Sequence, residues 1–427
     1  MKLALVGVGA AGTRIVDRIV RAERTTGRAI TDGNVLVYDT AGDAFADATA
    51  VPPDRRVLLG DAHPAVVRSG DAGAPNSETD APAASETDAA AGSATRLGVG
   101  GDPDAGATVA RADLPEIRRA LDSIDETAVA ATMVVAGLGG GTGSGVGSVV
   151  LDELRSAHES PVYALGVLPA ATESDERALT AARGVRTIVP LADAVFPVDN
   201  EAWRRSDRVS DDYAQINDRV ATRILALFGT GEGSAGAEVR VDPADVQRTL
   251  AVGGLAAIGR QTMAVDATGD GWLARLWRLL GVGTEPSAVD AGTIKSLVRR
   301  ALESELTVPC SVASADRVLL LLSGPPSTIS RKGFETGRYL LEEETATVEV
   351  LAGDESRPGA TEVTATVVLA NVTDVPPVER LQARATDRLE ATADETDSAT
   401  RAASTGSESA GNESTAEFEF SAGTEDA

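Results

Sequence analysis

Cysteine is nearly missing from this 427-residue chain, which holds only Cys310. A single cysteine forms no internal disulfide, and its presence alone fits a reducing compartment. Histidine is as scarce: His63 and His158 stand apart, with no cysteine or acidic cluster at metal-ligand spacing near either. The sequence therefore lacks the pattern of a disulfide-stabilised secreted protein and that of a metal site.

Lysine occurs only at Lys2, Lys295 and Lys332, so arginine carries most of the positive charge. Acidic residues number 65 against 39 lysines and arginines, a net charge of −26. No basic stripe is present that would meet nucleic-acid phosphates, so we exclude nucleic acid as a partner. An acidic, lysine-poor surface suits a protein kept soluble in concentrated salt, where self-repulsion is screened, and we take a halophilic cell as the working hypothesis.

Long hydrophobic runs are also missing, since no stretch approaches the roughly 20 apolar residues of a membrane span. The apolar N-terminus is interrupted by Gly7, Gly9 and Gly12 where a signal peptide would have an unbroken hydrophobic run. We therefore expect a soluble, cytoplasmic protein. The chain is long enough for two domains and a large buried core.

Glycine, by contrast, is concentrated at residues 137–145, with the sequence Gly-Leu-Gly-Gly-Gly-Thr-Gly-Ser-Gly. An apolar run before it predicts a buried strand, and helical spacing resumes after it from Val149 to Leu154. Without Cβ atoms, successive backbone N–H groups can approach phosphate oxygens, while the helix points its positive end at them. The Gly-Lys-Ser/Thr ending of a P-loop is missing. We interpret the stretch as another kind of phosphate-binding loop; a strand-to-helix turn without a ligand is the alternative.

A second glycine loop, Gly7-Val8-Gly9-Ala10-Ala11-Gly12, follows a predicted strand at 3–8. Together with the strand that ends at Asp39, it makes a fair dinucleotide-binding pattern, and the rival interpretation is an NAD-dependent oxidoreductase. A dinucleotide fold has no use for the richer loop at 139–145. We therefore prefer an arrangement in which both loops face one nucleotide.

The run from Gly139 to Gly145 resembles the signature of the tubulin/FtsZ superfamily, and Ala136-Gly137-Leu138 before it looks most like the archaeal CetZ branch. The resemblance covers about residues 1–380. It implies an α/β fold with a Rossmann-like GTPase domain, a mostly parallel sheet, a central helix and an α+β C-terminal activation domain. The predicted bounds are 1–208 for the GTP-binding domain, 209–228 for the helix and 229–382 for the activation domain with its catalytic loop.

Two segments are too poor in apolar residues to fold and are predicted to be disordered. One is an insertion at about 69–95, in which Ser-Glu-Thr-Asp-Ala is repeated, and the other is an acidic tail over 383–427.

The resemblance implies GTP and GDP as ligands, with Mg²⁺ held through the phosphates. A loop at 97–106 resembles the FtsZ loop that senses the terminal phosphate, Glu173 and Arg177 resemble an acid and an arginine near ribose and phosphate, and Asn200 resembles a residue at the base edge. Asp39 stands where the family usually has Asn. The implied binding set, apart from two helical residues, is Gly9, Ala10, Ala11, Gly12, Asp39, Gly98, Gly100, Gly101, Gly139, Gly140, Gly141, Thr142, Gly143, Ser144, Gly145, Glu173, Arg177 and Asn200.

Tyr213 and Asn217 complete that set. They lie four residues apart in a long helical pattern and so share a face. An aromatic ring that stacks on a purine and an amide that reads its edge suit this geometry. Half-buried packing of the tyrosine is the alternative.

Asp242 and Asp245, with Pro243 between them, open a predicted helix. By themselves they are typical of an N-cap aspartate and a favourable first-turn acid. The resemblance adds a catalytic interpretation, because FtsZ and tubulin carry acids at this spacing on a loop that enters the nucleotide pocket of the neighbouring subunit. Arg240 stands where FtsZ commonly has Asn.

Two segments are candidate contacts for other partners. Residues 271–281 form a short amphipathic pattern with two of the three tryptophans, which fits a membrane surface or a filament neighbour, or a helix packed on its own domain. Phe418 lies in the only apolar spot of the tail and is either a docking peptide for an adaptor protein or a chance feature.

The function implied by the resemblance is that of a GTPase whose active site is completed between subunits. It would polymerise head to tail into cytoskeletal filaments, in the cytoplasm and near the inner membrane surface, and help control cell shape or motility. An FtsZ-like division protein, a tubulin-like scaffold without turnover and the oxidoreductase stay open as alternatives.

Overall fold

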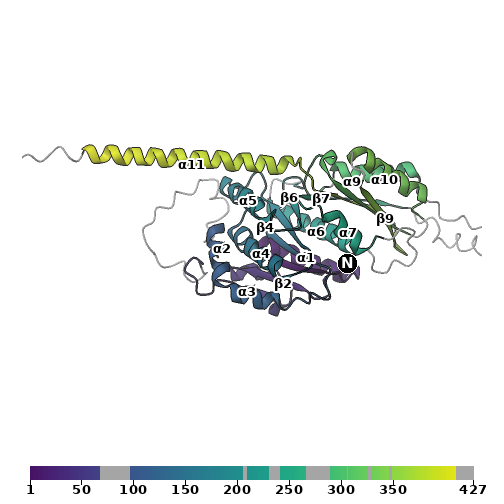
Figure 1. The fold of residues 1–427 in the computed structure, drawn as a ribbon, viewed down its shortest axis with the longest axis horizontal. Helices are drawn as coiled ribbons and strands as arrows, with labels where there is room; N and C mark the ends of the chain where they lie inside the picture. Colours follow the sequence, from purple (N-terminus) through teal and green to yellow (C-terminus); the bar gives the residue numbers. More distant parts are fainter. Residues whose placement is uncertain are drawn as a thin grey trace, which may run out of the picture.

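The computed structural model describes residues 1–67, 97–204, 209–229, 241–265, 289–304, 306–325, 328–345 and 349–409. The predicted insertion at about 69–95, the amphipathic segment 271–281, Arg240 and the tail around Phe418 lie outside these residues. Figure 1 shows two sheets with their helices, and one long helix that runs past the body of the molecule.

A six-stranded parallel sheet organises the N-terminal half. Its order is β3-β2-β1-β4-β5-β6, with β1 (Leu3–Val8), β2 (Val35–Asp39), β3 (Arg56–Leu58), β4 (Ala131–Gly137), β5 (Val162–Leu168) and β6 (Ala194–Asp199). Side chains alternate between the two faces along β1: Leu3 and Leu5 belong to one core cluster, Ala4 and Val6 to another. The sheet is thus covered on both faces, which explains the near-continuous apolar runs of its strands.

Helices cover the two faces of this sheet. The face of Leu3 and Leu5 packs against α1 (Gly9–Thr26) and α6 (Val209–Phe228), whose buried Ile216, Val220 and Ile224 repeat at helical spacing. The opposite face carries α2 (Pro103–Ala112), α3 (Leu114–Leu121), α4 (Gly147–Ala157) and α5 (Asp175–Ile188). Short 3₁₀ turns at Gly42–Phe45 and Pro53–Arg55 connect β2 to β3.

The C-terminal half contains a four-stranded mixed sheet in the order β7-β10-β8-β9. The strands are β7 (Ala256–Ala264), β8 (Arg317–Gly324), β9 (Val350–Ser356) and β10 (Glu362–Ala370); β10 is antiparallel to both neighbours, and β8 is parallel to β9. One face packs against α9 (Ala291–Ser304) and α10 (Arg331–Thr345), and the other against α6 and α7 (Pro243–Leu250). A 3₁₀ turn at Val312–Ser314 precedes β8.

Among the described residues, apolar packing, backbone hydrogen bonds and ion pairs join the two halves. Val195 of β6 pairs with Leu255, just before β7. Arg28, after α1, donates to both carboxylate oxygens of Glu355 on β9 at 2.7 and 2.8 Å, and the two side chains are 13% and 10% exposed. If this pair were broken, a charge with little access to water would be left without a partner, which is unfavourable. The contact therefore helps to hold the second sheet in place.

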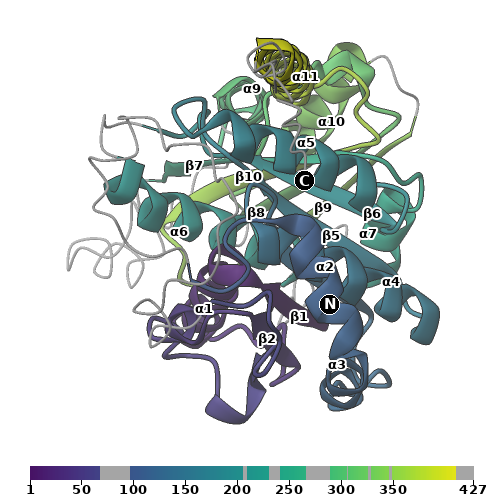
Figure 2. The ribbon, with the colours of Figure 1, turned by 90° about the vertical axis from the view of Figure 1, so that its left-hand side faces the viewer.

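The last described helix, α11 (Pro376–Ser409), continues past residue 383, where composition predicts that the disordered tail begins. Its first turns bury Val378, Leu381 and Ala385 against the core that includes α5, and these contacts hold the helix where propensity alone does not. Figure 2 views the molecule along this helix. Among the described residues, no helix combines the length and apolar character needed to cross a membrane.

Candidate functional site

A hollow of about 580 Å³ lies where the carboxyl ends of β1 and β4 meet. In the strand order, β2 and β3 follow on one side of β1, and β5 and β6 follow on the other side of β4. Open α/β sheets bind their ligands in the crevice at such a reversal of strand order. Most of the predicted binding residues line it: Gly9, Ala10, Ala11, Asp39, Gly100, Gly101, Gly139, Gly140, Gly141, Thr142, Gly143, Glu173, Arg177, Asn200, Tyr213 and Asn217.

Some of the lining glycines are required by the backbone and by close packing. Gly9 has φ +73°, and a Cβ on it would lie 3.1 Å from the backbone nitrogen of Gly143. The two glycine loops therefore touch each other, and side chains on both would separate them. A Cβ on Gly140 would meet only one atom within 4 Å, the Gly137 carbonyl oxygen at 3.9 Å, so this residue faces free space.

Four residues of the predicted set, Gly12, Gly98, Ser144 and Gly145, do not line the hollow. A Cβ on Gly12 would lie 2.1 Å from the Val135 carbonyl oxygen, and one on Gly145 would lie 2.2 Å from that of Pro103. Gly98 pairs with Val67, and the Ser144 hydroxyl donates to the Leu138 carbonyl rather than into the hollow. These four residues hold helices and loops together around the hollow.

The second half of the signature loop forms a π-helical turn, over Thr142–Val146, which leads directly into α4. π turns are rare and frequent at functional sites. Thr142 also shares a 2.8 Å hydrogen bond with the hydroxyl of Thr40, which follows β2. The start of this helix and the end of β2 are thereby fixed side by side at the rim of the hollow.

Asp39 ends β2 with its side chain 2% exposed. Its Oδ1 accepts from the Ala41 N–H at 3.0 Å, while Oδ2 has no hydrogen-bond partner among the described residues. Burial raises the pKa of this carboxyl from 3.8 to about 6, against the lowering by backbone N–H donors. The hollow therefore contains one buried carboxyl oxygen with unused hydrogen-bonding capacity.

Glu173 connects two other lining residues, Tyr213 and Arg177, to the backbone of Ala170. Its Oε1 accepts from the Ala170 N–H at 2.8 Å and from the Tyr213 hydroxyl at 3.1 Å, and its Oε2 accepts from Arg177 at 2.7 Å. Burial, then the nearby Glu173 charge, raise the pKa of Tyr213, so its ring stays neutral. An aromatic ring and a cation are held at fixed places beside the glycine loops.

Sequence reasoning missed several lining residues. Arg14 follows the first glycine loop by two residues and brings a second cation to the hollow beside Arg177; a basic residue so close to a glycine loop was the available signal. Ser174, Glu176 and Thr180 line it because they lie on or before α5, near Arg177. Val167 and Pro169 take part because β5 ends beside β4.

Asp242 and Asp245 do not line the hollow. They form a capping box at the start of α7: Asp242 Oδ1 accepts from the Asp245 N–H at 3.0 Å, and Asp245 Oδ2 accepts from the Asp242 N–H at 3.1 Å. Gln247 of the same helix donates to the carbonyl of Ala130, immediately before β4. The acids therefore lie at the amino end of the parallel sheet, whereas the hollow lies at its carboxyl end, as the positions of α7 and α2 in Figure 1 also show.

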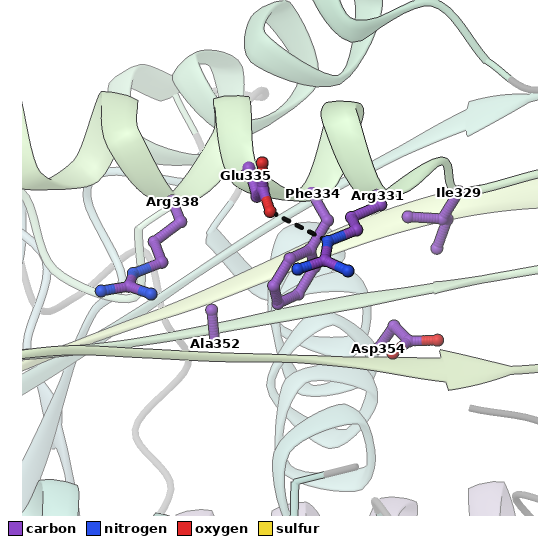
Figure 3. Close-up of a pocket in the computed structure, with 7 residues that line it drawn as sticks. All are labelled: Ile329, Arg331, Phe334, Glu335, Arg338, Ala352 and Asp354. Atoms are coloured by element: carbon purple, nitrogen blue, oxygen red, sulfur yellow. Dashed lines mark hydrogen bonds and ion pairs between the residues drawn. The ribbon is translucent and has the colours of Figure 1, made fainter. Parts of the chain in front are cut away.

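A second hollow, of about 370 Å³, lies between α10 and β9. In Figure 3, Arg331, Phe334 and Arg338 reach down from α10 toward Ala352 and Asp354 on the strand. Arg331 pairs with Glu335 and Arg338 with Glu342. The arginines of the first hollow are paired with acids as well, so ion pairing does not distinguish the two sites. The second hollow is not lined by a glycine loop in the part of the chain that the structure describes. The crevice beside β1 and β4 is therefore the better candidate site for an anionic ligand.

Comparison with known proteins decides the family. Residues 2–207 match the GTPase domain of the tubulin/FtsZ family, and residues 206–387 match the C-terminal domain of the tubulin-like CetZ proteins. The tubulin-like protein CetZ1 of Haloferax volcanii is 36% identical over 391 residues, which cover 90% of this chain and 91% of that protein. This chain belongs to the CetZ group of the tubulin/FtsZ family.

Solved CetZ structures agree with this assignment. The GDP-bound CetZ1 monomer of Haloferax volcanii superposes with a TM-score of 0.72 at 33% identity, covering 91% of this chain and all of that one. CetZ2 of the same organism, solved as a GTPγS-bound protofilament, gives 0.73 at 30% identity, with 92% and 99% covered. The tubulin/FtsZ fold and a GTPase domain are therefore established for the chain, and the oxidoreductase interpretation is set aside.

Proposed function

We propose that this CetZ-type GTPase holds GTP in the hollow beside β1 and β4 and hydrolyses it when a second copy of the chain stacks on that end. The observation that supports the proposal is that the glycine loops and the two acids lie at opposite ends of the parallel sheet. The glycine loops line the carboxyl end of one parallel sheet, and Asp242 and Asp245 lie beyond its amino end. One molecule therefore has a nucleotide hollow at one end and a pair of acids at the other.

Within one subunit the hollow supplies binding. Backbone from the loops at 9–11, 100–101 and 139–143 surrounds the phosphates, with Arg14 and Arg177 as counter-charges. Tyr213 stacks on the purine, and Asn200 and Asn217 read its edge. GDP-bound and GTPγS-bound relatives support the choice of a guanine nucleotide.

Mg²⁺ fits this site as a partner of the nucleotide. The described residues contain no group of three side chains that would hold a metal. Mg²⁺ commonly binds through phosphate oxygens and water with few protein ligands, and bound there it neutralises charge on the phosphates. The carboxyls of the hollow that would accept hydrogen bonds from that water are those of its lining: Asp39, Asp43, Glu173 and Glu176.

The neighbouring copy supplies the acids. In the capping box each carboxylate uses one oxygen for a backbone N–H, and the capped helix fixes the direction of both. The second oxygen of each is left to orient and polarise the attacking water. A capping box is compatible with this role, because rigid support of a catalytic group at a helix end lowers the cost of positioning it.

Contact between opposite ends of identical subunits is heterologous and does not close, so it propagates into a head-to-tail filament. A relative solved as a protofilament supports this assembly. The loop at 97–106 lines the same end of the hollow, and loss of the terminal phosphate removes its ligand and loosens the joint. We further propose that the filament helps control cell shape or motility, as the resemblance to CetZ proteins implies, with an FtsZ-like role in division as the alternative.

A mixing experiment tests the shared site. Gly140→Asp places a carboxylate in open space inside the hollow, where it repels phosphate. Asp245→Asn removes a charge while keeping a side chain that can accept a capping hydrogen bond. Each variant alone should turn over GTP at least about 100-fold more slowly than the unmodified chain. An equal mixture should regain activity, because about a quarter of random junctions pair an intact hollow with intact acids.

Phosphate release is the measurement, with circular dichroism to verify that both variants are folded. The rate per molecule of the unmodified chain should rise with protein concentration. A mixture as inactive as its parts, or a rate independent of concentration, would refute the shared site; absence of phosphate release would favour a scaffold without turnover.

A further inference from the structure

Arg384 of α11 grips the loop that forms one wall of the nucleotide hollow. Its Nη2 donates to the backbone carbonyl of Glu173 at 2.9 Å and to Asp175 Oδ1 at 2.7 Å, and its Nε donates to the same Oδ1 at 3.2 Å. One guanidinium thus bridges a main-chain oxygen and a carboxylate two residues apart. The C-terminal helix thereby fixes the backbone that enters α5.

The residue held in this way connects to the interior of the hollow. The Glu173 side chain accepts from Tyr213 and from Arg177, both of which line the hollow, while Arg384 holds the Glu173 backbone from outside. The Glu173 side chain is 14% exposed, so its carboxylate depends on these donors rather than on water. A displacement of the Glu173 backbone would move the acceptor shared by an aromatic ring and a cation of the site.

Arg384 couples the position of α11 to the position of the loop before α5. It lies next to Ala385, which is 6% exposed and packed in the core with Leu381 one turn earlier, so the helix cannot slide without loss of buried apolar surface. The same helix carries Arg388, whose Nη2 pairs with the Glu176 side chain at 3.2 Å. Loss of Arg388 removes a charge near the first turn of α5, whereas loss of Arg384 also releases the Glu173 backbone. The two substitutions therefore separate the effect of charge from the effect of loop position.

We propose that Arg384 is a positioning residue for nucleotide binding: by clamping Glu173 and Asp175 it sets the place of Tyr213 and Arg177 against the nucleotide. The proposal rests on the hollow being the GTP site. It makes a helix of the C-terminal half part of the nucleotide-binding apparatus of the N-terminal half. Tight nucleotide binding then requires α11 to be docked on α5.

Equilibrium titration with a fluorescent GDP, at protein concentrations well below assembly, tests the proposal on the full chain. Arg384→Ala should weaken binding about fivefold to tenfold, as expected for loss of charge-assisted hydrogen bonds that hold a loop. Arg384→Lys should fall in between, because an ammonium keeps the charge but cannot form the fork. Arg388→Ala, the matched control, should stay within about twofold.

Steady-state turnover adds a second readout. Arg384→Ala should raise KM for GTP while kcat at saturating GTP stays within about twofold, because the clamp touches none of the reacting atoms. Thermal midpoints without nucleotide should be equal for Arg384→Ala and Arg388→Ala.

Three results would overturn the proposal: unchanged affinity in Arg384→Ala, equal losses in Arg384→Ala and Arg388→Ala, or a weaker affinity accompanied by a lower thermal midpoint than the control. Failure of the unmodified chain to bind GDP would instead refute the GTP site itself.

Discussion

The hydroxyl of Tyr213 donates to Glu173 Oε1 across 3.1 Å, and this bond joins α6 to the loop before α5. Both residues line the hollow, so the bond fixes the ring relative to the loop that carries Glu173. It also gives the tyrosine two separable functions. The hydroxyl holds the loop, and in the proposed GTP site the ring stacks on the purine.

Substitutions at Tyr213 separate these functions. Tyr213→Phe keeps the ring and loses only the hydrogen bond, and we expect GDP affinity within about threefold of the unmodified chain. Tyr213→Ala removes the stacking surface and should weaken binding about tenfold or more. Isothermal titration with GDP measures both. Equal affinities for the Phe and Ala variants would show that the ring does not stack on the base.

The buried carboxyl of Asp39 predicts a pH dependence of stability. Its folded-state pKa of about 6 lies above the 3.8 of an unperturbed carboxyl, so folding disfavours the ionised form. The resulting cost is absent below about pH 4, grows between pH 4 and 6, and is complete above pH 6. Asp39→Asn should therefore raise the free energy of unfolding at pH 7 by about 1–3 kcal/mol and by much less at pH 4.

Chemical denaturation of both proteins at the two pH values measures that difference. The comparison is between variant and unmodified chain at each pH, so acid effects on other carboxyls cancel. An equal gain at pH 4 and pH 7 would show that burial of charge at Asp39 is not its source.

The glycines of the two loops divide into packing and lining residues. Gly12→Ala would drive a Cβ to 2.1 Å from the Val135 carbonyl, so α1 must move off the sheet, and we expect a loss of about 2–4 kcal/mol in the free energy of unfolding. Gly140→Ala is the matched control, because its Cβ meets open space. It should change stability by less than about 1 kcal/mol. Chemical denaturation of the two variants measures these free energies. Similar losses of stability would contradict the division into packing and lining glycines.

Much of the candidate site was readable from local patterns. A strand that runs into consecutive glycines and then a helix is encoded by neighbouring residues, so both glycine loops and their flanking elements were predicted. The spacing of Tyr213 and Asn217 placed both on one face of α6 for the same reason. The first turn of α7 was likewise predicted, including Asp242 as its cap.

Other features of the site depend on atoms far apart in the chain. Ser144 turns its hydroxyl to a carbonyl instead of the hollow, and Arg14 enters the lining, only because helices pack on the sheet in one particular way. The first turns of α11 are held by apolar contacts that composition does not reveal, and the helix continues beyond them past residue 383.

The sequence by itself determined the glycine loops, the buried parallel strands and the family to which they belong, because these are set by short-range periodicity and by residue types at fixed spacing. The family resemblance implied that the acids serve a neighbouring subunit, and the structure places them at the end of the sheet away from the hollow. Only the tertiary structure decided that Arg384 contacts the loop that carries Glu173. Those relations depend on how elements separated by many residues are brought together, and packing of the whole core, rather than any local pattern, fixes them.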